Sequence, residues 1–178
     1  MDKKPKKAVF IIAFKDFRDP EYFIPKEILN KAGITTFCAS SKQGTAIGVE
    51  GGEEDVDIIL EQVKVKDYDA IIFVGGIGAA GYINNPLAHK IAQDAVIERK
   101  ILAGICIGPT ILAKAGVLKG VKATVWSSLM DKSAIRILQD QKALYQPENV
   151  VIDGKIITAD GPGSAQAFAL AIVKALGD

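Results

Sequence analysis

The chain has 178 residues, 49% of them apolar, which is enough to form the core of one compact domain rather than two. Its 22 basic and 21 acidic residues leave a formal net charge of +1, which excludes the strongly basic surface of proteins that bind nucleic acid or anionic membranes. No apolar stretch approaches the roughly 20 residues of a membrane span, and no signal-peptide pattern follows the basic start. We therefore expect a soluble single domain over residues 1–178 with small-molecule partners.

Strands and helices alternate along the first half of the chain. Residues 8–14 form a continuous apolar run, typical of a central strand that is buried on both faces of a parallel sheet. Apolar residues at helical spacing between Pro20 and Gly33 predict the first crossover helix. Residues 34–39 predict a second strand, and residues 40–52, rich in Ser, Gly and Lys, are compatible with a short excursion or a small hairpin.

The alternation continues to the end of the chain. The expected elements are a strand at 70–74, a helix at 86–99, a strand at 101–105, a helix at 109–115, a strand at 123–126, a helix at 128–139, a hairpin of strands 149–152 and 155–159, and a last helix at 164–176. This order predicts an α/β fold with a doubly wound, mostly parallel sheet sandwiched by helices. Ligands bind such sheets beyond the carboxyl ends of the strands, where four loops are expected to converge: residues 16–21, 75–76, 106 and 160–163.

Cys106 lies where the strand at 101–105 turns directly into a helix, which is the geometry of a nucleophile elbow. The start of a helix favours a thiolate over a thiol, so we expect a reactive sulfur. The alternative is that Cys106 only fills the core. Gly104 and the pair Gly108-Pro109 favour a functional thiol, because a plain core position needs no such tight backbone.

Glu21 is the expected partner of this thiol. A carboxyl beside a thiolate in a poorly solvated cleft has a raised pKa and can donate a hydrogen bond to sulfur. Alternatively, Glu21 is an acid that complements the dipole of a helix start. Gly75, Gly76 and the amide of Ile107 can supply N–H groups to an oxyanion, although a Gly-Gly pair is also compatible with a simple tight turn. No Lys-Ser or Lys-Thr follows these glycines, so we do not expect a nucleotide site.

His89, the only histidine, falls inside the helix expected at 86–99, where we interpret it as a solvent-facing residue. A single histidine without clustered carboxylates predicts no metal site, and no cofactor is expected. The two cysteines, Cys38 and Cys106, fit neither a disulfide framework nor a zinc pattern, which favours a reducing cytoplasm; Cys38 is assigned to packing.

Taken together, these residues resemble the ThiJ/PfpI superfamily of class I glutamine amidotransferase-like domains, most closely its DJ-one branch. The matching segments are residues 21–25, 68–72 with the following Gly75-Gly76, 105–110, and 161–163 with the following 167–173. The resemblance implies a flavodoxin-like fold and a cytoplasmic homodimer. It also implies that Cys106 is the nucleophilic or oxidisable thiol, that Glu21 is its hydrogen-bonded acid, and that the amides of Gly75, Gly76 and Ile107 surround the sulfur.

The sequence departs from the family pattern at the residues that would assist the thiol. The protease-like branch has a histidine where this chain has Ile107, and its glutamate from an oligomer contact aligns with Ala80. The DJ-one branch places a histidine where this chain has Trp126. A thiol-dependent hydrolase normally uses an imidazole, so these departures predict weak catalysis.

The resemblance also places Trp126, Asp160, Gly161 and Pro162 at the pocket. Asp160 replaces an arginine that favours anions in the DJ-one branch. We therefore expect the pocket to repel a carboxylate or a sulfinate.

Three functions follow as hypotheses. The first is a stress-related, cysteine-dependent protein with weak hydrolase or glyoxalase- and deglycase-like activity, in which Cys106 attacks a small reactive carbonyl or is oxidised. The second is a non-catalytic redox sensor or a chaperone-like homodimer, which the missing partners favour. The third, an intracellular cysteine peptidase, is disfavoured because the histidine of its triad is absent.

Overall fold

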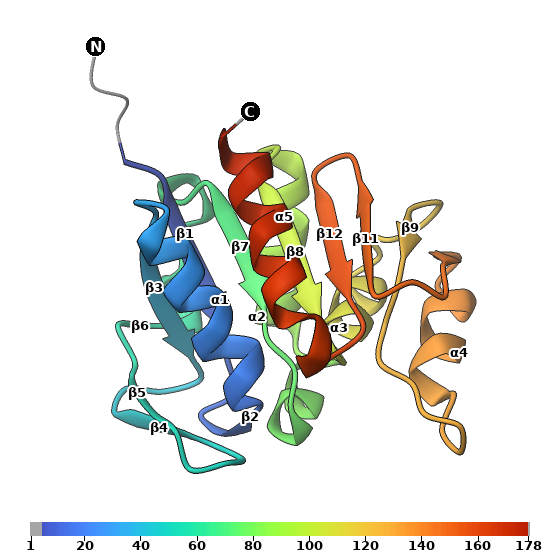
Figure 1. Cartoon of the computed structure of the whole chain (residues 1–178), viewed down its shortest axis with the longest axis horizontal. Coiled ribbons are helices and arrows are strands. Elements are labelled where there is room, and N and C mark those ends of the chain that lie inside the picture. The colour runs from blue at the N-terminus through green and yellow to red at the C-terminus, as the bar shows by residue number, and fades with distance from the viewer. Residues whose placement is uncertain (1–4, 178) are drawn as a thin grey trace.

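The fold is that of a computed structural model, which describes residues 5–177. A seven-stranded sheet in the order β11-β12-β8-β7-β1-β3-β6 runs through its centre, and helices cover both faces (Figure 1). Its strands are β1 (Lys7–Ile11), β3 (Thr35–Ser40), β6 (Ile58–Ile59), β7 (Ala70–Phe73), β8 (Ile101–Ile105), β11 (Val150–Asp153) and β12 (Ile156–Ala159). Only β11 runs antiparallel, paired with β12 in the expected hairpin. The α/β architecture with a mostly parallel sheet is therefore confirmed.

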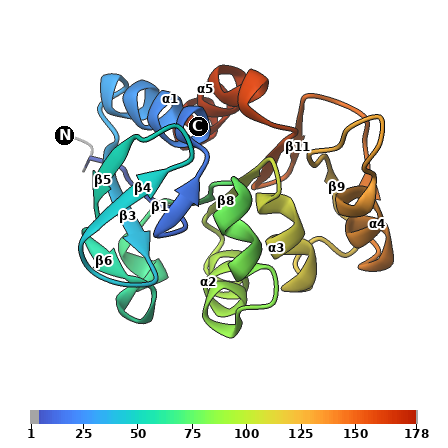
Figure 2. The same cartoon turned by 90° about the horizontal axis from the view of Figure 1, so that it is seen from below.

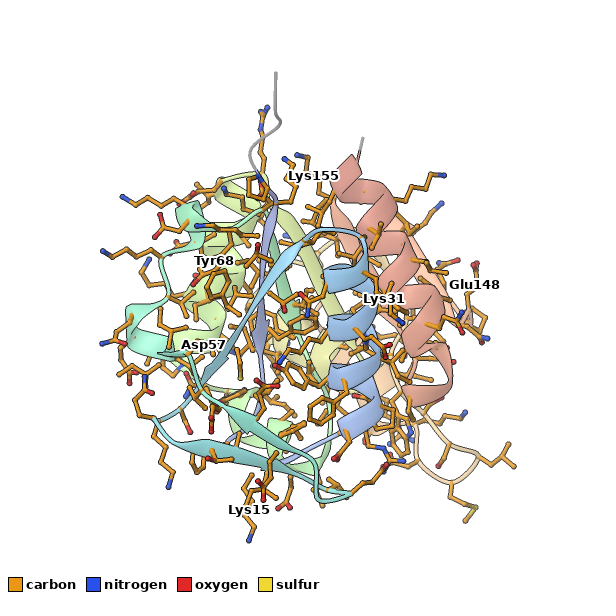
Figure 3. The ribbon with its side chains drawn as sticks, turned by 60° about the vertical axis from the view of Figure 1, so that its left-hand side comes forward. Lys15, Lys31, Asp57, Tyr68, Glu148 and Lys155 are labelled. Carbon is orange, nitrogen blue, oxygen red and sulfur yellow. The ribbon has the colours of Figure 1, made fainter. Side chains whose placement is uncertain are left out.

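Helices pack on both sides of the sheet (Figures 1 and 2). The helices are α1 (Asp19–Lys31), α2 (Pro86–Ile97), α3 (Gly108–Lys114), α4 (Ser133–Asp140) and α5 (Ala165–Gly177). Helices α1 and α5 lie side by side over one core, while α2, α3 and α4 enclose the second. Charged side chains such as Lys15, Lys31, Glu148 and Lys155 project from the outside of this sandwich (Figure 3).

The apolar run near the start of the chain supplies both cores. In β1, Val9 and Ile11 belong to the core under α2 and α3, whereas Ala8 and Phe10 belong to the core under α1 and α5. Because successive side chains of a strand point to opposite faces, a strand buried on both sides has to be apolar throughout. Burying each large side chain stabilises the fold by about 1.5–3 kcal/mol, so this strand is a major contributor.

The run at 8–14 is longer than the strand it forms, because β1 ends at Ile11. The chain then enters a separate three-stranded sheet made of β2 (Lys15–Phe17), β4 (Thr45–Gly48) and β5 (Glu53–Asp55). Strands β4 and β5 form an antiparallel pair, which is the small hairpin expected in this region. This sheet lies beside the carboxyl end of β1 and leads the chain into α1.

The expected strand at 123–126 does not join the main sheet. Only β9 (Lys122–Ala123) forms there, and it pairs with β10 (Leu144–Tyr145) in a separate two-stranded sheet. The next amides have other acceptors: the N–H of Thr124 donates to Thr158 Oγ1 at 2.9 Å, and the N–H of Trp126 donates to Cys106 O at 2.9 Å. These hydrogen bonds hold residues 124–126 against Thr158 and Cys106, so the segment does not continue as a strand.

The helix expected from residue 128 begins at Ser133. Ser128 Oγ accepts from the N–H of Asp131 at 3.0 Å, and Asp131 Oδ1 accepts from the N–H of Ser133 at 2.8 Å. Such local side-chain hydrogen bonds hold the backbone in turns and delay the helix. Short 3-10 turns complete the fold at Leu60–Gln62, Val65–Asp67, Ile77–Tyr82 and Pro162–Ser164. Within residues 5–177, every helix falls short of the length and apolar character that a bilayer crossing demands.

Candidate active site

A pocket of about 650 Å³ opens at the carboxyl ends of the parallel strands. Its lining residues are Arg18, Glu21, Val49, Gly76, Ile77, Ala80, Cys106, Ile107, Trp126, Asp131 and Pro162. The structure thus brings together Glu21, Gly76, Cys106, Ile107 and Trp126, which lie far apart in the sequence. Pro162 joins them from the fourth expected loop.

Cys106 occupies a sharp corner between β8 and α3. Its φ of 62° is in the left-handed region, where a residue with a side chain is strained by about 1–3 kcal/mol. Two hydrogen bonds of 2.9 Å hold this corner, from the N–H of Cys106 to Ala159 O and from the N–H of Trp126 to Cys106 O. A Cβ on Gly108 would lie 2.6 Å from Phe73 O, so only glycine allows the helix to begin so close to the neighbouring strand.

Glu21 lies in the first turn of α1, but its carboxyl points to the elbow rather than capping the helix. The side chain is completely buried, and Oε2 accepts a 3.0 Å hydrogen bond from the N–H of Gly75. A Cβ on Gly75 would lie 2.5 Å from Glu21 Oε2 and 2.6 Å from Cys106 Cβ. Gly75 therefore packs directly between the acid and the cysteine, which explains why no side chain is tolerated there.

Burial sets the protonation of this pair. It raises the pKa of Glu21 to about 7, while the Cys106 thiol, the N–H of Gly75 and the Arg18 charge act in the opposite direction. Burial also raises the pKa of Cys106 to about 12, and the Glu21 carboxylate adds to this rise. The expectation that the helix start favours the thiolate is therefore wrong, because burial and the Glu21 carboxylate outweigh the N–H of Ile107 at the start of α3.

Between about pH 7 and about pH 12 the two groups together hold one proton, and these pKa values place it mainly on sulfur. The proton can sit on sulfur, facing the Glu21 carboxylate, or on Glu21, facing a thiolate. The N–H groups of Gly76 and Ile107 favour the thiolate form, and the N–H of Gly75 favours the carboxylate form. In the thiolate form the geometry provides a nucleophile with a neutral acid next to it.

The remaining walls of the pocket are largely apolar. Val49, Ile77, Ala80, Trp126 and Pro162 surround the opening above the sulfur. Two of these residues, Trp126 and Ala80, stand where the resemblance to the superfamily implies a histidine and a glutamate. The structure therefore encloses the thiol with hydrocarbon where an imidazole would otherwise lie.

Asp160 does not line the pocket. Its Oδ1 accepts a 2.5 Å hydrogen bond from Ser164 Oγ, which turns the carboxylate towards the start of α5. The expectation that Asp160 makes the pocket repel anions is therefore wrong. Gly161 packs next to the Trp126 ring, since a Cβ on Gly161 would be 3.6 Å from Trp126 Cδ1.

Four lining residues were not singled out from the sequence: Arg18, Val49, Ile77 and Asp131. Val49 reaches the pocket because Asp19 accepts hydrogen bonds from the N–H groups of Glu50 at 2.8 Å and Gly52 at 2.7 Å, which fold the loop after β4 against α1. The one available signal was the position of Arg18, three residues before Glu21 in the same loop.

Two residues set aside from the sequence lie outside the site. Cys38 is buried with 1% exposure, in agreement with its assignment to packing. His89 is half-buried in α2, and its Nε2 lies 2.7 Å from Ile83 O, so it does not simply face solvent as expected.

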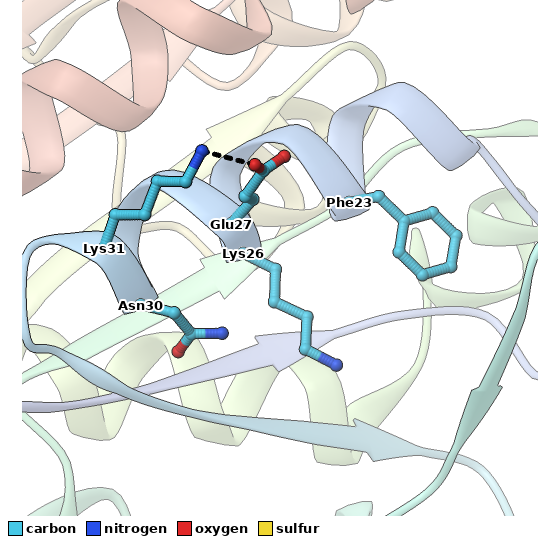
Figure 4. Close-up of a pocket in the computed structure, with 5 residues that line it drawn as sticks. All are labelled: Phe23, Lys26, Glu27, Asn30 and Lys31. Carbon is cyan, nitrogen blue, oxygen red and sulfur yellow. Dashed lines mark hydrogen bonds and ion pairs between the residues drawn. The ribbon is translucent and has the colours of Figure 1, made fainter.

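A second hollow of about 600 Å³ lies on the outer face of α1 and is lined by Phe23, Lys26, Glu27, Asn30 and Lys31 (Figure 4). None of these five side chains is a thiol or hydroxyl nucleophile. Its charges are already paired, for example Lys31 with Glu27 at 2.5 Å. We therefore assign the chemistry to the pocket at Cys106.

Comparisons with known proteins agree with this geometry. The model of the DJ-1/PfpI family matches residues 6–175. The chain is 30% identical to Deglycase PfpI of Pyrococcus furiosus, over 94% of this chain and 98% of that protein. It is 29% identical to the Glutathione-independent glyoxalase DJR-1.2 of Caenorhabditis elegans, over 96% of this chain and 89% of that protein.

Among solved structures, the ThiJ/PfpI domain protein of Brachyspira murdochii has the same fold. It superposes with a TM-score of 0.93 at 32% identity, covering 98% of each chain. The fold of this chain is thus that of a known architecture.

Proposed function

Because the chain belongs to the DJ-1/PfpI family, we propose that it is a cysteine-dependent enzyme that acts on small reactive carbonyl compounds, as the names of its deglycase and glyoxalase relatives suggest. The observation that carries the proposal is the contact of Glu21 and Cys106 across Gly75 at the floor of the pocket. A volume of about 650 Å³ suits a small molecule.

In the proposed reaction, the Cys106 thiolate adds to the carbonyl carbon. The new S–C bond forms while the π electrons of the C=O bond move to oxygen, which takes the proton from Glu21. The product of this step is a hemithioacetal. Before this proton arrives, negative charge moves from sulfur to the carbonyl oxygen, and the N–H groups of Gly76 and Ile107 can then donate to that oxygen.

Turnover is expected to be modest. Among the described lining residues, Glu21 is the only acid that contacts the thiol, and no imidazole assists it. General acid–base catalysis typically contributes about 10²–10⁴-fold, so loss of one such group is costly. For the same reason we do not propose a peptidase.

The test is consumption of methylglyoxal by wild type, Cys106→Ser and Glu21→Gln, with Cys38→Ser as the matched cysteine control. We expect Cys106→Ser to abolish turnover and Glu21→Gln to lower it by about 10²-fold or more, while Cys38→Ser keeps the wild-type rate per folded protein. Wild-type turnover in Cys106→Ser would refute the proposal.

Oxidation of Cys106 is a second candidate function. Asp160 faces away from the pocket, which removes the repulsion that opposed a sulfinate. Intact mass after mild peroxide is the test: a gain of two oxygens on Cys106 supports the role, and an unchanged mass contradicts it. We retain a homodimer in a reducing cytoplasm as part of the proposal, on the strength of the family resemblance, and analytical ultracentrifugation would test the dimer.

A further inference from the structure

Arg18 brings a positive charge to the pocket that the reaction above does not use. It lines the same cavity as Cys106 and Glu21, and it lies near enough to Glu21 to lower the pKa of that carboxyl. Its Nε is buried and has no hydrogen-bond partner among residues 5–177. A buried N–H donor without an acceptor is unfavourable, so the protein leaves part of the hydrogen-bonding capacity of this guanidinium unused.

Neighbouring groups hold Arg18 against the pocket wall. Its backbone N–H donates to Gly75 O at 3.1 Å, next to the elbow. Its Nη2 lies 3.4 Å from Glu50 Oε1, and the N–H of Glu50 donates to Asp19 Oδ2 at 2.8 Å. The guanidinium is therefore presented by a folded loop at the edge of the site.

The pair of Arg18 and Glu50 leaves room for a competing anion. Only one guanidinium nitrogen contacts Glu50, and the two side chains are 39% and 49% exposed. Ion pairs at such exposure contribute little, so a carboxylate of a ligand can replace or join Glu50. The two terminal nitrogens of a guanidinium can donate to both oxygens of a carboxylate, and the Arg18 side chain is exposed enough to present them.

The other groups of the pocket fit a small anionic ligand with an apolar body. Among the described lining residues Arg18 is the only cation. Asp131 is exposed at the rim, and its Oδ1 accepts from the N–H of Ser133 at 2.8 Å. Burial raises the pKa of Glu21 to about 7, so near neutral pH this carboxyl carries less negative charge than an exposed one. Most other walls are hydrocarbon.

We propose that Arg18 is a specificity-determining residue that selects carbonyl compounds with a carboxylate next to the reacting carbon, the class of 2-oxo acids and of aldehydes such as glyoxylate. This inference rests on the proposed function for the reaction itself. The carboxylate binds Arg18 while Cys106 adds to the neighbouring carbonyl carbon. The S–C bond forms, the carbonyl oxygen takes the proton shared by Cys106 and Glu21, and no group is oxidised or reduced.

Alkylation of Cys106 tests the selection without requiring turnover. Iodoacetate and iodoacetamide form the same S–C bond and release iodide, but only iodoacetate carries a carboxylate. We expect the ratio of their rate constants, iodoacetate over iodoacetamide, to fall roughly tenfold in Arg18→Met, the factor for one lost charge-assisted hydrogen bond at a half-exposed site. Glu50→Gln, which leaves the arginine in place, should raise the ratio, and the exposed Lys119→Met should leave it unchanged. A wild-type ratio in Arg18→Met overturns the proposal.

Binding to Cys106→Ser separates this inference from the proposed function. Trp126, the only tryptophan of the chain, lines the pocket, so its fluorescence reports a bound ligand. We expect pyruvate to bind better than its methyl ester, and this preference to disappear in the double variant with Arg18→Met. If Cys106 resists both alkylating reagents, the proposed reaction fails while this measurement still decides the role of Arg18. Equal affinities for pyruvate and its methyl ester would overturn the proposed role of Arg18.

Discussion

The pocket at Cys106 and the hollow on α1 have similar volumes, about 650 and 600 Å³. They differ in whether their polar side chains are exposed and paired or buried and incompletely paired. On α1, Glu27 and Lys31 are 65% and 74% exposed and pair with each other, and Asn30 Oδ1 accepts from Thr36 Oγ1 at 2.9 Å (Figure 4). At Cys106, Glu21 Oε1 and Arg18 Nε are buried without a partner among residues 5–177. Cavity size therefore does not locate chemistry, whereas incompletely paired buried polar groups do.

The pH dependence of stability should show the largest contrast between the two regions. In the folded state the pKa of Glu21 is raised to about 7 from its ordinary 4.5, so the folded protein binds the proton more tightly than the unfolded chain. This contribution is fully present below pH 4.5 and is lost as the pH rises to about 7, a change of about 3 kcal/mol.

Chemical denaturation of wild type and Glu21→Gln across this range is the measurement. Relative to the glutamine variant, wild type should lose stability between pH 4.5 and 7, because glutamine cannot titrate. Glu27→Gln on α1 is the matched control. Its free energy of unfolding should change with pH in the same way as that of wild type through the upper part of this range. Parallel curves for wild type and Glu21→Gln would mean that burial does not govern this carboxyl.

Filling the gap between the acid and the cysteine should have the next largest effect. In Gly75→Ala the new methyl group overlaps Glu21 Oε2 and Cys106 Cβ, so we expect a destabilisation of about 1–3 kcal/mol, together with loss of methylglyoxal consumption. Gly81→Ala is the control, because a Cβ there meets nothing within 4 Å. The measurements are the melting temperature and the rate of methylglyoxal consumption of the two variants, each compared with wild type. Wild-type behaviour of Gly75→Ala would show that the acid and the elbow are not packed together.

Changes on α1 should have the smallest effect. Lys31→Gln removes an exposed i,i+4 ion pair with Glu27, and such pairs contribute little because solvent screens them. The melting temperature should therefore move little, and the alkylation rate of Cys106 should stay at the wild-type value. A large change in that rate would mean that the hollow on α1 is coupled to the thiol, and the distinction between the two regions would fail.

The sequence by itself determined the elements that depend on short-range patterns. The apolar runs at β1, β7 and β8 predict strands buried on both faces, because alternate side chains serve two cores. The glycines around Cys106 predict the sharp corner, because a helix that begins against a neighbouring strand leaves no room for a Cβ. These signals were enough to place Glu21, Gly75 and Cys106 at one sheet edge.

Only the tertiary structure decided how the pocket is charged. Asp160 turns towards Ser164 because Ser164 donates to it, and Arg18 pairs with Glu50, which lies in a loop that Asp19 holds from 31 residues away. The pKa of Cys106 likewise follows from its burial beside Glu21 rather than from the start of α3. Hydrogen bonds and burial depend on contacts between distant segments, so a local pattern that predicts a strand or an elbow carries no information about the charge that will face it.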